Sequence, residues 1–225
     1  MSRTVLIFVG PPGAGKGSLS RMCVEQFGWK QISTGNLCRM HIQEQTEIGK
    51  EIDFAIKSGK LISDTLVTKM VVDWLSEQSG NETLILDGYP RTVAQAEMLE
   101  GLIKSKFPSL KITIVRLVIS NEEVVARLGT RKICENKACQ AVYSSRAVSL
   151  KAHDGSSCDR CGYPIVQRND DTPQAIIERL KTYYKHEQPL LDLYQTMGYS
   201  LPKLNVNRPI NMVFEELKKM VGVDA

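Results

Sequence analysis

Residues 10 to 18 form a glycine-rich segment, Gly-Pro-Pro-Gly-Ala-Gly-Lys-Gly-Ser, directly after the apolar run Val5 to Val9. Glycines let a loop turn tightly, so that its backbone N–H groups point at phosphate oxygens, and a lysine adds a mobile positive charge. A helix that follows such a loop adds its positive N-terminal end. The segment therefore predicts a phosphate-binding loop made by Gly10, Gly13, Ala14, Gly15, Lys16, Gly17 and Ser18.

The segment departs from the usual phosphate-loop pattern in one place. Residues 10 to 16 fit G-x-x-x-x-G-K, but position 17 is glycine and the expected hydroxyl arrives one place later, as Ser18. A glycine-rich turn between a strand and a helix can also be purely structural. Four glycines and a lysine after an apolar run favour phosphate binding.

A second candidate segment runs from Leu84 to Arg91, where an apolar strand ends in Asp87 before a Gly-Tyr-Pro turn. The carboxyl edge of a parallel sheet faces the nucleotide in phosphate-loop folds, so Asp87 can orient Mg²⁺, directly or through water, while Ser18 contacts the ion. Arg91 can hold a phosphate through two parallel hydrogen bonds. The structural alternatives are a turn or capping role for Asp87 and a surface ion pair for Arg91.

Four arginines make a third pattern. Arg127 and Arg131 lie four apart on a predicted helix and so share a face, and Arg168 and Arg179 follow the cysteine-rich segment. Phosphoryl transfer needs positive charge around the phosphate oxygens more than it needs covalent chemistry. A single arginine of this kind is more often a solvated surface residue. Their joint placement around one insertion favours a catalytic role.

Four of the six cysteines lie close together in the sequence. Four residues separate Cys134 from Cys139, two separate Cys158 from Cys161, and the stretch between the two pairs has the length of a zinc-ribbon hairpin. Zinc is the favoured interpretation; free thiols and a redox disulfide are the alternatives, and His153 could replace one thiolate. Cys23 and Cys38 stand apart and are expected to be buried.

Alternating strands and helices must position these groups. Strands are predicted at 4–9, 30–33, 83–87, 111–119 and 200–206, and helices at 15–27, 66–78, 93–106, 122–131 and 175–197. This alternation predicts an α/β fold with a central parallel sheet flanked by helices. Two segments interrupt it: short helices over 33–62 and a loop-rich hairpin over 131–168.

Composition excludes little. The chain has 225 residues, 42% of them hydrophobic, and a net charge of +4, which anionic substrates explain as well as a mixed-charge surface does. The apolar start is too short for a signal peptide or a membrane span, so we expect a cytoplasmic protein that binds no membrane. A nucleic-acid-binding module is disfavoured because the cysteine hairpin lacks a concentrated basic and aromatic surface. A GTPase-like switch is disfavoured because Asn136-Lys137 continues as Ala-Cys.

Taken in order, several motifs resemble those of the adenylate kinase family over about residues 4 to 220. They are residues 10 to 18, Ile32-Ser-Thr-Gly-Asn36 with Arg39, Gly59-Lys-Leu-Ile62, Asp87-Gly-Tyr-Pro-Arg91 with Gln95, and Arg168-Asn-Asp-Asp171. The resemblance implies a monomeric phosphate-loop nucleoside monophosphate kinase that uses Mg²⁺ to interconvert ATP plus AMP with two ADP. It also implies a core of 1–32, 63–130 and 169–225, an AMP-binding insertion at 33–62 and a zinc-ribbon-like lid at 131–168.

The resemblance also implies residue roles. Lys16 would contact the transferring phosphates, and Arg127, Arg131, Arg168 and Arg179 would surround the phosphate chain, the last two also on the AMP side. Arg208 would lie at the ATP adenine. The AMP site would be formed by Thr34, Arg39, Lys60, Leu61, Ile62, Gly88, Arg91 and Gln95, with Gln95 facing the base. The zinc ligands would be Cys134, Cys139, Cys158 and Cys161.

The chain departs from the family pattern in small ways. Its first cysteine pair has four intervening residues where two are expected, which zinc sites tolerate. Asn36, Tyr89 and Arg208 replace the commoner Asp, Phe and Lys, and none of these changes removes a proposed catalytic group. A related kinase that uses GTP as donor, or another monophosphate as acceptor, remains the alternative, because backbone groups largely hold the donor base in this family.

Overall fold

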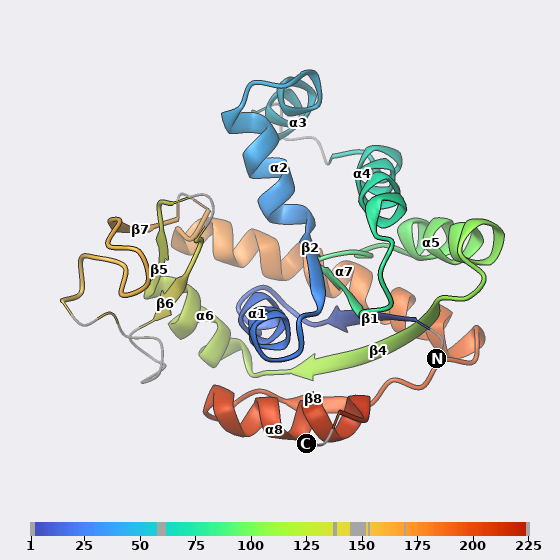
Figure 1. Cartoon of the computed structure of the whole chain (residues 1–225). Helices are drawn as coiled ribbons and strands as arrows, with labels where there is room; N and C mark the ends of the chain where they lie inside the picture. Colours follow the sequence, from blue (N-terminus) through green and yellow to red (C-terminus); the bar gives the residue numbers. More distant parts are fainter. Residues whose placement is uncertain are drawn as a thin grey trace. The chain divides into compact units, whose positions relative to one another are not determined.

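The structure is a computed structural model, shown in Figure 1 with its elements labelled. It describes residues 3–57, 62–136, 139–144, 152, 154–168 and 170–223. The chain divides into two compact units. Unit 1 contains Met1–Val9, Ser20–Val115 and His186–Leu201, and unit 2 contains Gly10–Leu19, Arg116–Lys185 and Pro202–Ala225.

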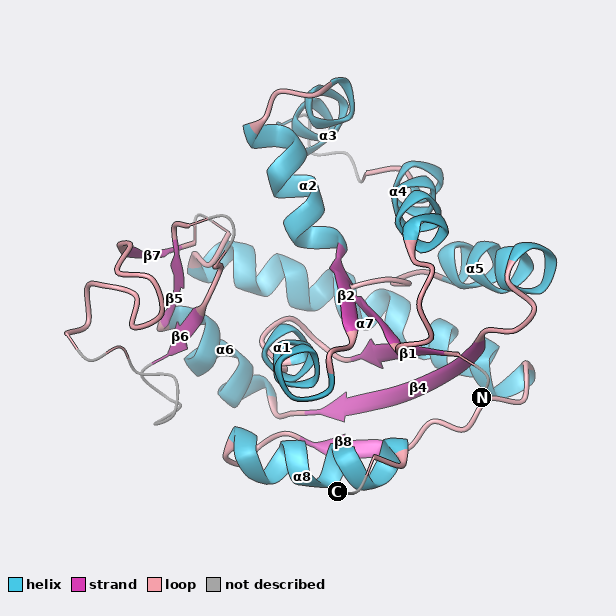
Figure 2. Ribbon diagram, viewed as in Figure 1, coloured by secondary structure: helices cyan, strands magenta, loops and turns pink. Residues whose placement is uncertain are grey.

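A five-stranded sheet lies at the centre of the fold, in the order β2-β3-β1-β4-β8. The strands are β1 (Thr4–Val9), β2 (Lys30–Ser33), β3 (Leu84–Asp87), β4 (Lys111–Val118) and β8 (Lys203–Asn205). The pairs β1 with β3, β2 with β3, and β4 with β8 are parallel. Helices flank the sheet, as Figure 2 shows in cyan around magenta strands. The α/β fold with a parallel sheet is therefore confirmed.

Unit 1 carries helices α2 (Thr34–Gln43), α3 (Glu47–Lys57), α4 (Asp64–Glu77) and α5 (Val93–Lys106). Its main core packs the strands β1 and β3 against α4 and α5, with Leu84 and Val71 fully buried. A smaller core of Cys38, Ile52 and Met70 holds α2, α3 and α4 together. Continuous apolar strands of this kind are typical of parallel sheets that are covered on both faces.

Unit 2 carries α6 (Asn121–Gly129), α8 (Ile210–Val221) and a second, antiparallel sheet. That sheet has the order β6-β5-β7, made by β5 (Arg131–Cys134), β6 (Val142–Ser144) and β7 (Ile165–Gln167). Two helices, α1 (Lys16–Phe27) and α7 (Pro173–Thr196), run from one unit into the other. Among the described residues, no helix is both long and apolar enough to cross a bilayer.

Most predicted elements match the structure, and three need correction. The helix predicted to reach Arg131 ends at Gly129, and Arg131 opens β5, so Arg127 and Arg131 do not share a helical face. The reason is that residues 131 to 134 pair with both neighbouring strands, while the Thr130 hydroxyl donates to the carbonyl of Ala126.

The other two corrections concern the C-terminal part. The predicted strand at 200–206 shortens to Lys203–Asn205, and helix α8 was not predicted. Its signal was present, because Val213, Phe214 and Leu217 have helical spacing and are buried. The helix ends at Val221, and Gly222 follows it at a φ of 71°, a conformation that glycine adopts without strain.

Candidate active site

The predicted phosphate loop lies in unit 2, between β1 and α1. Gly13 and Gly15 have φ angles of 83° and 91°, which residues with a side chain rarely adopt. In addition, a Cβ atom added to Gly13 would lie 3.0 Å from the Cγ of Leu128. Lys16 is the first residue of α1, and its amino group donates to the carbonyls of Gly10 and Pro11 at 2.6 and 2.9 Å. Gly17 and Ser18 follow in the first helical turn, where backbone N–H groups have no intrahelical acceptor. The loop therefore has the backbone that anion binding requires.

A buried carboxylate joins two of the four predicted arginines. The Asp171 side chain is 0% exposed and accepts from Arg131 Nε and Nη2 at 2.7 and 2.6 Å, and from Arg179 Nη1 at 3.0 Å. Arg168 pairs in the same two-bond manner with Asp170, at 2.9 Å for each bond. The structure thus brings Arg131, Arg168 and Arg179 together through two adjacent aspartates.

Arg127 and Arg208 are held separately. Arg127 pairs with Glu123 at 2.9 Å and donates to the carbonyl of Val206 at 2.6 Å. Arg208, just before α8, pairs with Glu216 and donates to the carbonyl of Asn205. Every predicted arginine of unit 2 therefore already has a carboxylate partner, with which an incoming phosphate must share or exchange hydrogen bonds.

A second group of predicted residues gathers in unit 1, at the start of α2. The Thr34 hydroxyl and Arg91 Nε both donate to the carbonyl of Gly88, at 3.0 and 2.7 Å. A Cβ atom added to Gly35 would lie 3.5 Å from a guanidinium nitrogen of Arg39 and 3.9 Å from one of Arg91. Arg39 also bonds the side chain of Asn36. Two guanidinium groups thus converge beside a helix N-terminus, which is a suitable arrangement for an anionic group.

The same charges act on a nearby thiol. Burial raises the pKa of Cys38, and the positive charges of Arg91 and Arg39 oppose that shift. Cys38 is one turn into α2 and packs in the small core of unit 1. Its buried position agrees with the prediction.

Gln95 is buried in unit 1, and its carboxamide has two firm partners. Its Nε2 donates to Asp64 at 2.7 Å, and its Oε1 accepts from the backbone N–H of Arg91 at 2.8 Å. The sequence reasoning did not include Asp64. An aspartate at the first position of a predicted helix is ordinarily explained by the helix dipole alone, so the sequence carried no separate signal.

Asp87 ends β3 at the carboxyl edge of the sheet, as predicted, in register with Phe8 of β1 and Ser33 of β2. Gln31 approaches its carboxylate at 3.5 Å. Ile62 packs against the small core around Cys38. Lys60 and Leu61, which are predicted to line the AMP site together with Ile62, lie outside the described residues, as does His153.

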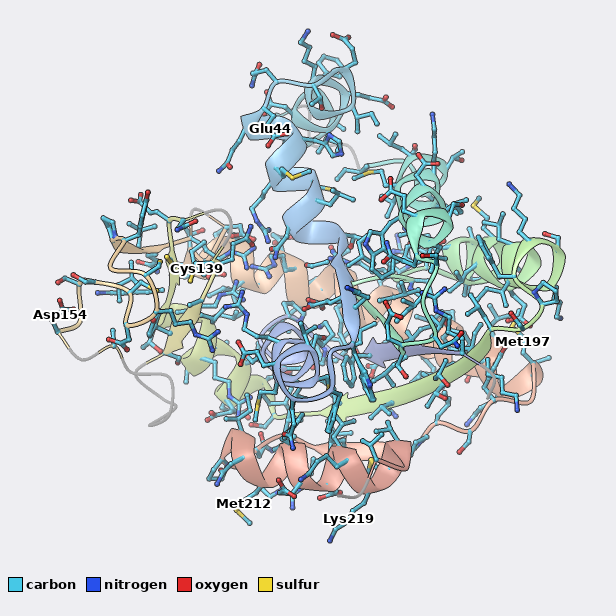
Figure 3. All side chains as sticks on the ribbon, viewed as in Figure 1. Glu44, Cys139, Asp154, Met197, Met212 and Lys219 are labelled. Carbon is cyan, nitrogen blue, oxygen red and sulfur yellow. The ribbon has the colours of Figure 1, made fainter. Side chains whose placement is uncertain are left out.

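The four clustered cysteines meet in unit 2. Their sulfurs all lie within 4.8 Å of one another, with Cys134 to Cys161 at 3.4 Å and Cys139 to Cys158 at 3.7 Å. Tetrahedral zinc with bonds of about 2.3 Å to sulfur places its ligand sulfurs about 3.8 Å apart. The four thiols could therefore hold one metal ion. Figure 3 labels Cys139 in this region.

The surroundings of Cys158 favour its thiolate. Burial acts to raise its pKa, but hydrogen bonds from the Tyr143 hydroxyl and the backbone N–H groups of Arg160 and Cys161 lower it to about 6. The Tyr143 oxygen lies 3.2 Å from the sulfur. Since metals bind thiolates, this environment suits a metal ligand.

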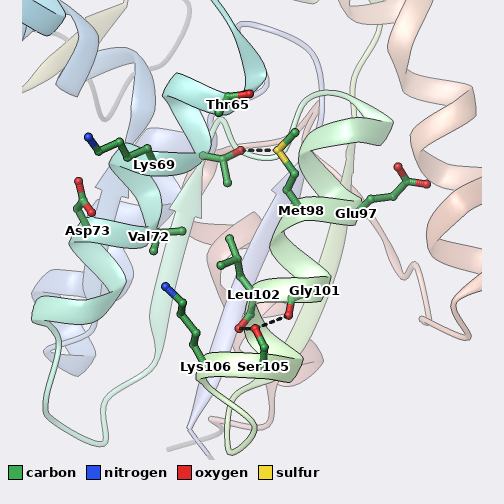
Figure 4. A pocket seen from close by; sticks show the side chains of 11 residues that line it. Thr65, Lys69, Val72, Asp73, Glu97, Met98, Gly101, Leu102, Ser105 and Lys106 are labelled. Carbon is green, nitrogen blue, oxygen red and sulfur yellow. Dashed lines mark hydrogen bonds between the residues drawn. The ribbon is translucent and has the colours of Figure 1, made fainter.

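A groove of about 530 Å³ lies between α4 and α5 and is drawn in Figure 4. Met98 and Leu102 contribute apolar surface, and the hydroxyl of Thr68 bonds the Met98 sulfur at 3.5 Å. None of the site residues predicted from the sequence lines this groove. The groove therefore shares no lining residue with the phosphate loop or with the group at the start of α2.

Comparisons with known proteins identify the family of the chain. A family model described as adenylate kinase matches residues 8–199. The chain is similar to the adenylate kinase of Thermotoga maritima, with 38% identity over 96% of each chain. It is 34% identical to that of Methanothrix thermoacetophila over 96% of this chain and 98% of the relative, and 37% identical to that of Chlamydia muridarum over 94% and 85%. The phosphate loop, the paired arginines and these matches together place the chain in the adenylate kinase family.

Proposed function

We propose that this chain catalyses the Mg²⁺-dependent reaction ATP + AMP = 2 ADP. The observation that carries the acceptor side is the convergence of Arg39 and Arg91 beside Gly35, at the N-terminus of α2. Two guanidinium groups at a helix start suit a dianionic monophosphate. The family match supports the reaction type.

The proposal assigns the donor phosphates to the loop of unit 2. Lys16, now bonded to two loop carbonyls, would turn to the phosphate oxygens, and the backbone N–H groups of Gly15, Gly17 and Ser18 would hold them. Ser18 and Asp87 would hold the magnesium ion, Asp87 directly or through water, and the ion would supply positive charge to the phosphates. Arg208 would lie at the ATP adenine.

In the reaction, an AMP phosphate oxygen forms a bond to the γ-phosphorus of ATP, and the bond from that phosphorus to the β,γ-bridging oxygen breaks. Arg127, Arg131, Arg168 and Arg179 would stabilise the charge on the transferring group. Asp170 and Asp171 hold three of these arginines in fixed orientations before the phosphates bind. Such preorganisation reduces the rearrangement needed at the moment of transfer.

The proposal also covers the parts of the molecule. Residues 33–62 would bind AMP together with Gln95, and residues 131–168 would be a lid that excludes water from the phosphates. The four cysteines would hold a structural zinc ion, because four thiolates leave no open position for a substrate. A monomeric state, implied by the resemblance, and a cytoplasmic location, expected from the short apolar start, complete it.

A substrate panel tests the proposal. Purified protein with Mg²⁺ is assayed with ATP or GTP against AMP, GMP, CMP and UMP, and its metal content, mass in solution and cellular fraction are determined. We expect transfer from ATP to AMP and one zinc ion per chain. Preference for GTP as donor would support the alternative GTP:AMP activity, and no transfer to any monophosphate would refute the proposal.

A further inference from the structure

The carboxamide of Gln95 is fixed in one orientation. The side-chain oxygens of Asp64 can only accept hydrogen bonds, and the backbone N–H of Arg91 can only donate one. The contacts of 2.7 and 2.8 Å therefore assign Nε2 to the Asp64 side and Oε1 to the Arg91 side. Turning the amide over would place donor against donor and acceptor against acceptor.

The carboxylate that fixes this amide is itself held on two sides. Asp64 is the first residue of α4, where the helix dipole favours its negative charge. Its second oxygen accepts from the Thr92 hydroxyl at 3.0 Å, and that hydroxyl caps α5 by accepting from the N–H of Gln95 at 3.1 Å. The starts of α4 and α5 are thereby joined around one side chain.

These contacts leave part of the amide available. A glutamine carboxamide has two N–H donors and two acceptor positions on its oxygen. Among the residues that the structure describes, Nε2 bonds Asp64 and Oε1 bonds the N–H of Arg91, so one donor and one acceptor position remain toward that part of the chain. Gln95 therefore presents one donor and one acceptor in a fixed order.

Purine bases differ in which of their two neighbouring hydrogen-bonding groups is the donor and which is the acceptor. A 6-aminopurine such as adenine offers an acceptor at N1 beside a donor at its 6-amino group. A 6-oxopurine such as hypoxanthine offers a donor at N1 beside an acceptor at O6. A fixed amide can pair with both groups of one purine and must oppose both groups of the other, and such mismatches in buried hydrogen-bonding sites discriminate strongly.

We propose that Asp64 is a positioning residue that orients Gln95, and so makes the acceptor site select 6-aminopurine over 6-oxopurine monophosphates. This inference rests on the proposed function, in which Gln95 faces the AMP base. Asp64 does not contact the substrate in this account. It acts through the orientation of the amide.

The test compares AMP with IMP, which differs from AMP at the two positions that the amide reads. Asp64→Ala removes the carboxylate that accepts from Gln95 Nε2. The Gln95 amide can then turn over, and the only contact within the described residues that it loses by turning is the one with the backbone N–H of Arg91. We expect the ratio of kcat/KM for AMP over IMP to fall about tenfold, mainly through KM, with KM for ATP unchanged. Asp64→Asn can still accept through its amide oxygen, and we expect it to keep most of the selectivity.

Asp73→Ala is the matched control, because Asp73 is an exposed aspartate of the same helix that lines the separate groove of Figure 4. We expect it to keep the wild-type ratio. An unchanged ratio in Asp64→Ala, or an equal fall in both alanine variants, would overturn the inference.

Two measurements on the unmodified chain keep the inference testable if Asp64→Ala does not fold. Equal phosphorylation of AMP and IMP by the unmodified chain would overturn it without any variant. No transfer to AMP would instead refute the proposed function. In that case, calorimetric titration with AMP and with IMP still tests the inference, since equal affinities contradict base selection by Gln95.

Discussion

Replacing Asp171 with asparagine should reveal how much of the stability of unit 2 depends on one buried carboxylate. The aspartate is 0% exposed and holds Arg131 through two hydrogen bonds and Arg179 through a third. Asparagine has nearly the same size, but it removes the charge and turns one of the two acceptor atoms into a donor that faces a guanidinium group. Arg131 is itself 14% exposed, so water replaces little of what is lost.

The expected cost follows from the burial. Breaking a buried ion pair by removing one partner costs about 3 to 5 kcal/mol, and asparagine keeps one accepting atom, so we expect about 3 kcal/mol. In a chain of this size, 1 kcal/mol shifts the melting temperature by about 2 to 4 °C, which gives a loss of about 6 to 12 °C. Raising the salt concentration should change this loss little, because the pair is shielded from solvent.

The neighbouring aspartate supplies the control. Asp170 also accepts two bonds from Arg168, but its side chain is 43% exposed, and pairs at exposed sites contribute about 0 to 1 kcal/mol. Asp170→Asn should therefore lower the melting temperature by no more than a few degrees. The comparison separates burial from the two-bond pairing itself, since both aspartates hold an arginine in the two-bond manner.

Calorimetry gives the melting temperatures, and amide hydrogen exchange in β5 and the first half of α7 locates the effect. Tryptophan fluorescence is unsuitable because Trp29 and Trp74 both lie in unit 1. Equal losses in the two variants, or a loss under 2 °C in Asp171→Asn, would refute the argument that the buried carboxylate dominates.

Three further predictions concern the loop and the cysteines. Lys16→Ala should lower kcat by at least about 100-fold, measured in a coupled assay, while the melting temperature stays within a few degrees, because its two carbonyl partners can bond water instead. Gly13→Ala should lower the free energy of unfolding by about 1 to 3 kcal/mol in urea, because it combines a φ of 83° with a Cβ that would lie 3.0 Å from Leu128. Cys134→Ser should abolish the zinc binding proposed for the four thiols, measured by elemental analysis, and this variant or treatment with a chelator should make 131–168 the first site of limited proteolysis.

Controls for these predictions come from the same chain. Gly101→Ala lies inside α5 with no atom within 4 Å of its added Cβ, so it should stabilise the protein by about 0.5 to 1 kcal/mol. A Gly13→Ala protein as stable as Gly101→Ala would contradict the loop argument. Near-normal turnover in Lys16→Ala would remove its catalytic role. A protein whose metal content and proteolysis pattern survive Cys134→Ser would rule out the four-thiol site.

Local patterns predicted most of the fold. The bounds of β1, β2 and α5 were predicted to the residue. The apolar run marks β1, and the structure shows that the Thr92 hydroxyl caps the start of α5. The phosphate loop was likewise visible, since its glycines and Lys16 lie within one short segment. The sequence also indicated the four cysteines as a group, and the structure brings their sulfurs together.

Partners that lie far apart in the sequence were the part that local patterns could not supply. Asp64 and Gln95 are 31 positions apart, and Arg131 and Asp171 are 40 apart, so each pair depends on how whole elements pack. The helix predicted to include Arg131 was wrong for the same reason, because strand pairing with β6 and β7 decides its conformation. The roles of these residues toward the nucleotides stay predictions.

Strand β5 is only four residues long, and it carries Arg131 at one end and Cys134 at the other. Arg131 forms an ion pair with Asp171, and Cys134 belongs to the cysteine cluster. The two ends of this short strand are therefore held by two different kinds of interaction. Loss of the proposed metal ion would remove the anchor at Cys134 and leave the ion pair of Arg131 with Asp171 to hold the strand alone. We therefore expect depletion of the proposed metal ion to weaken the binding of multiply charged phosphates before it unfolds the protein. The affinity for these substrates would then report whether the thiols hold their metal ion.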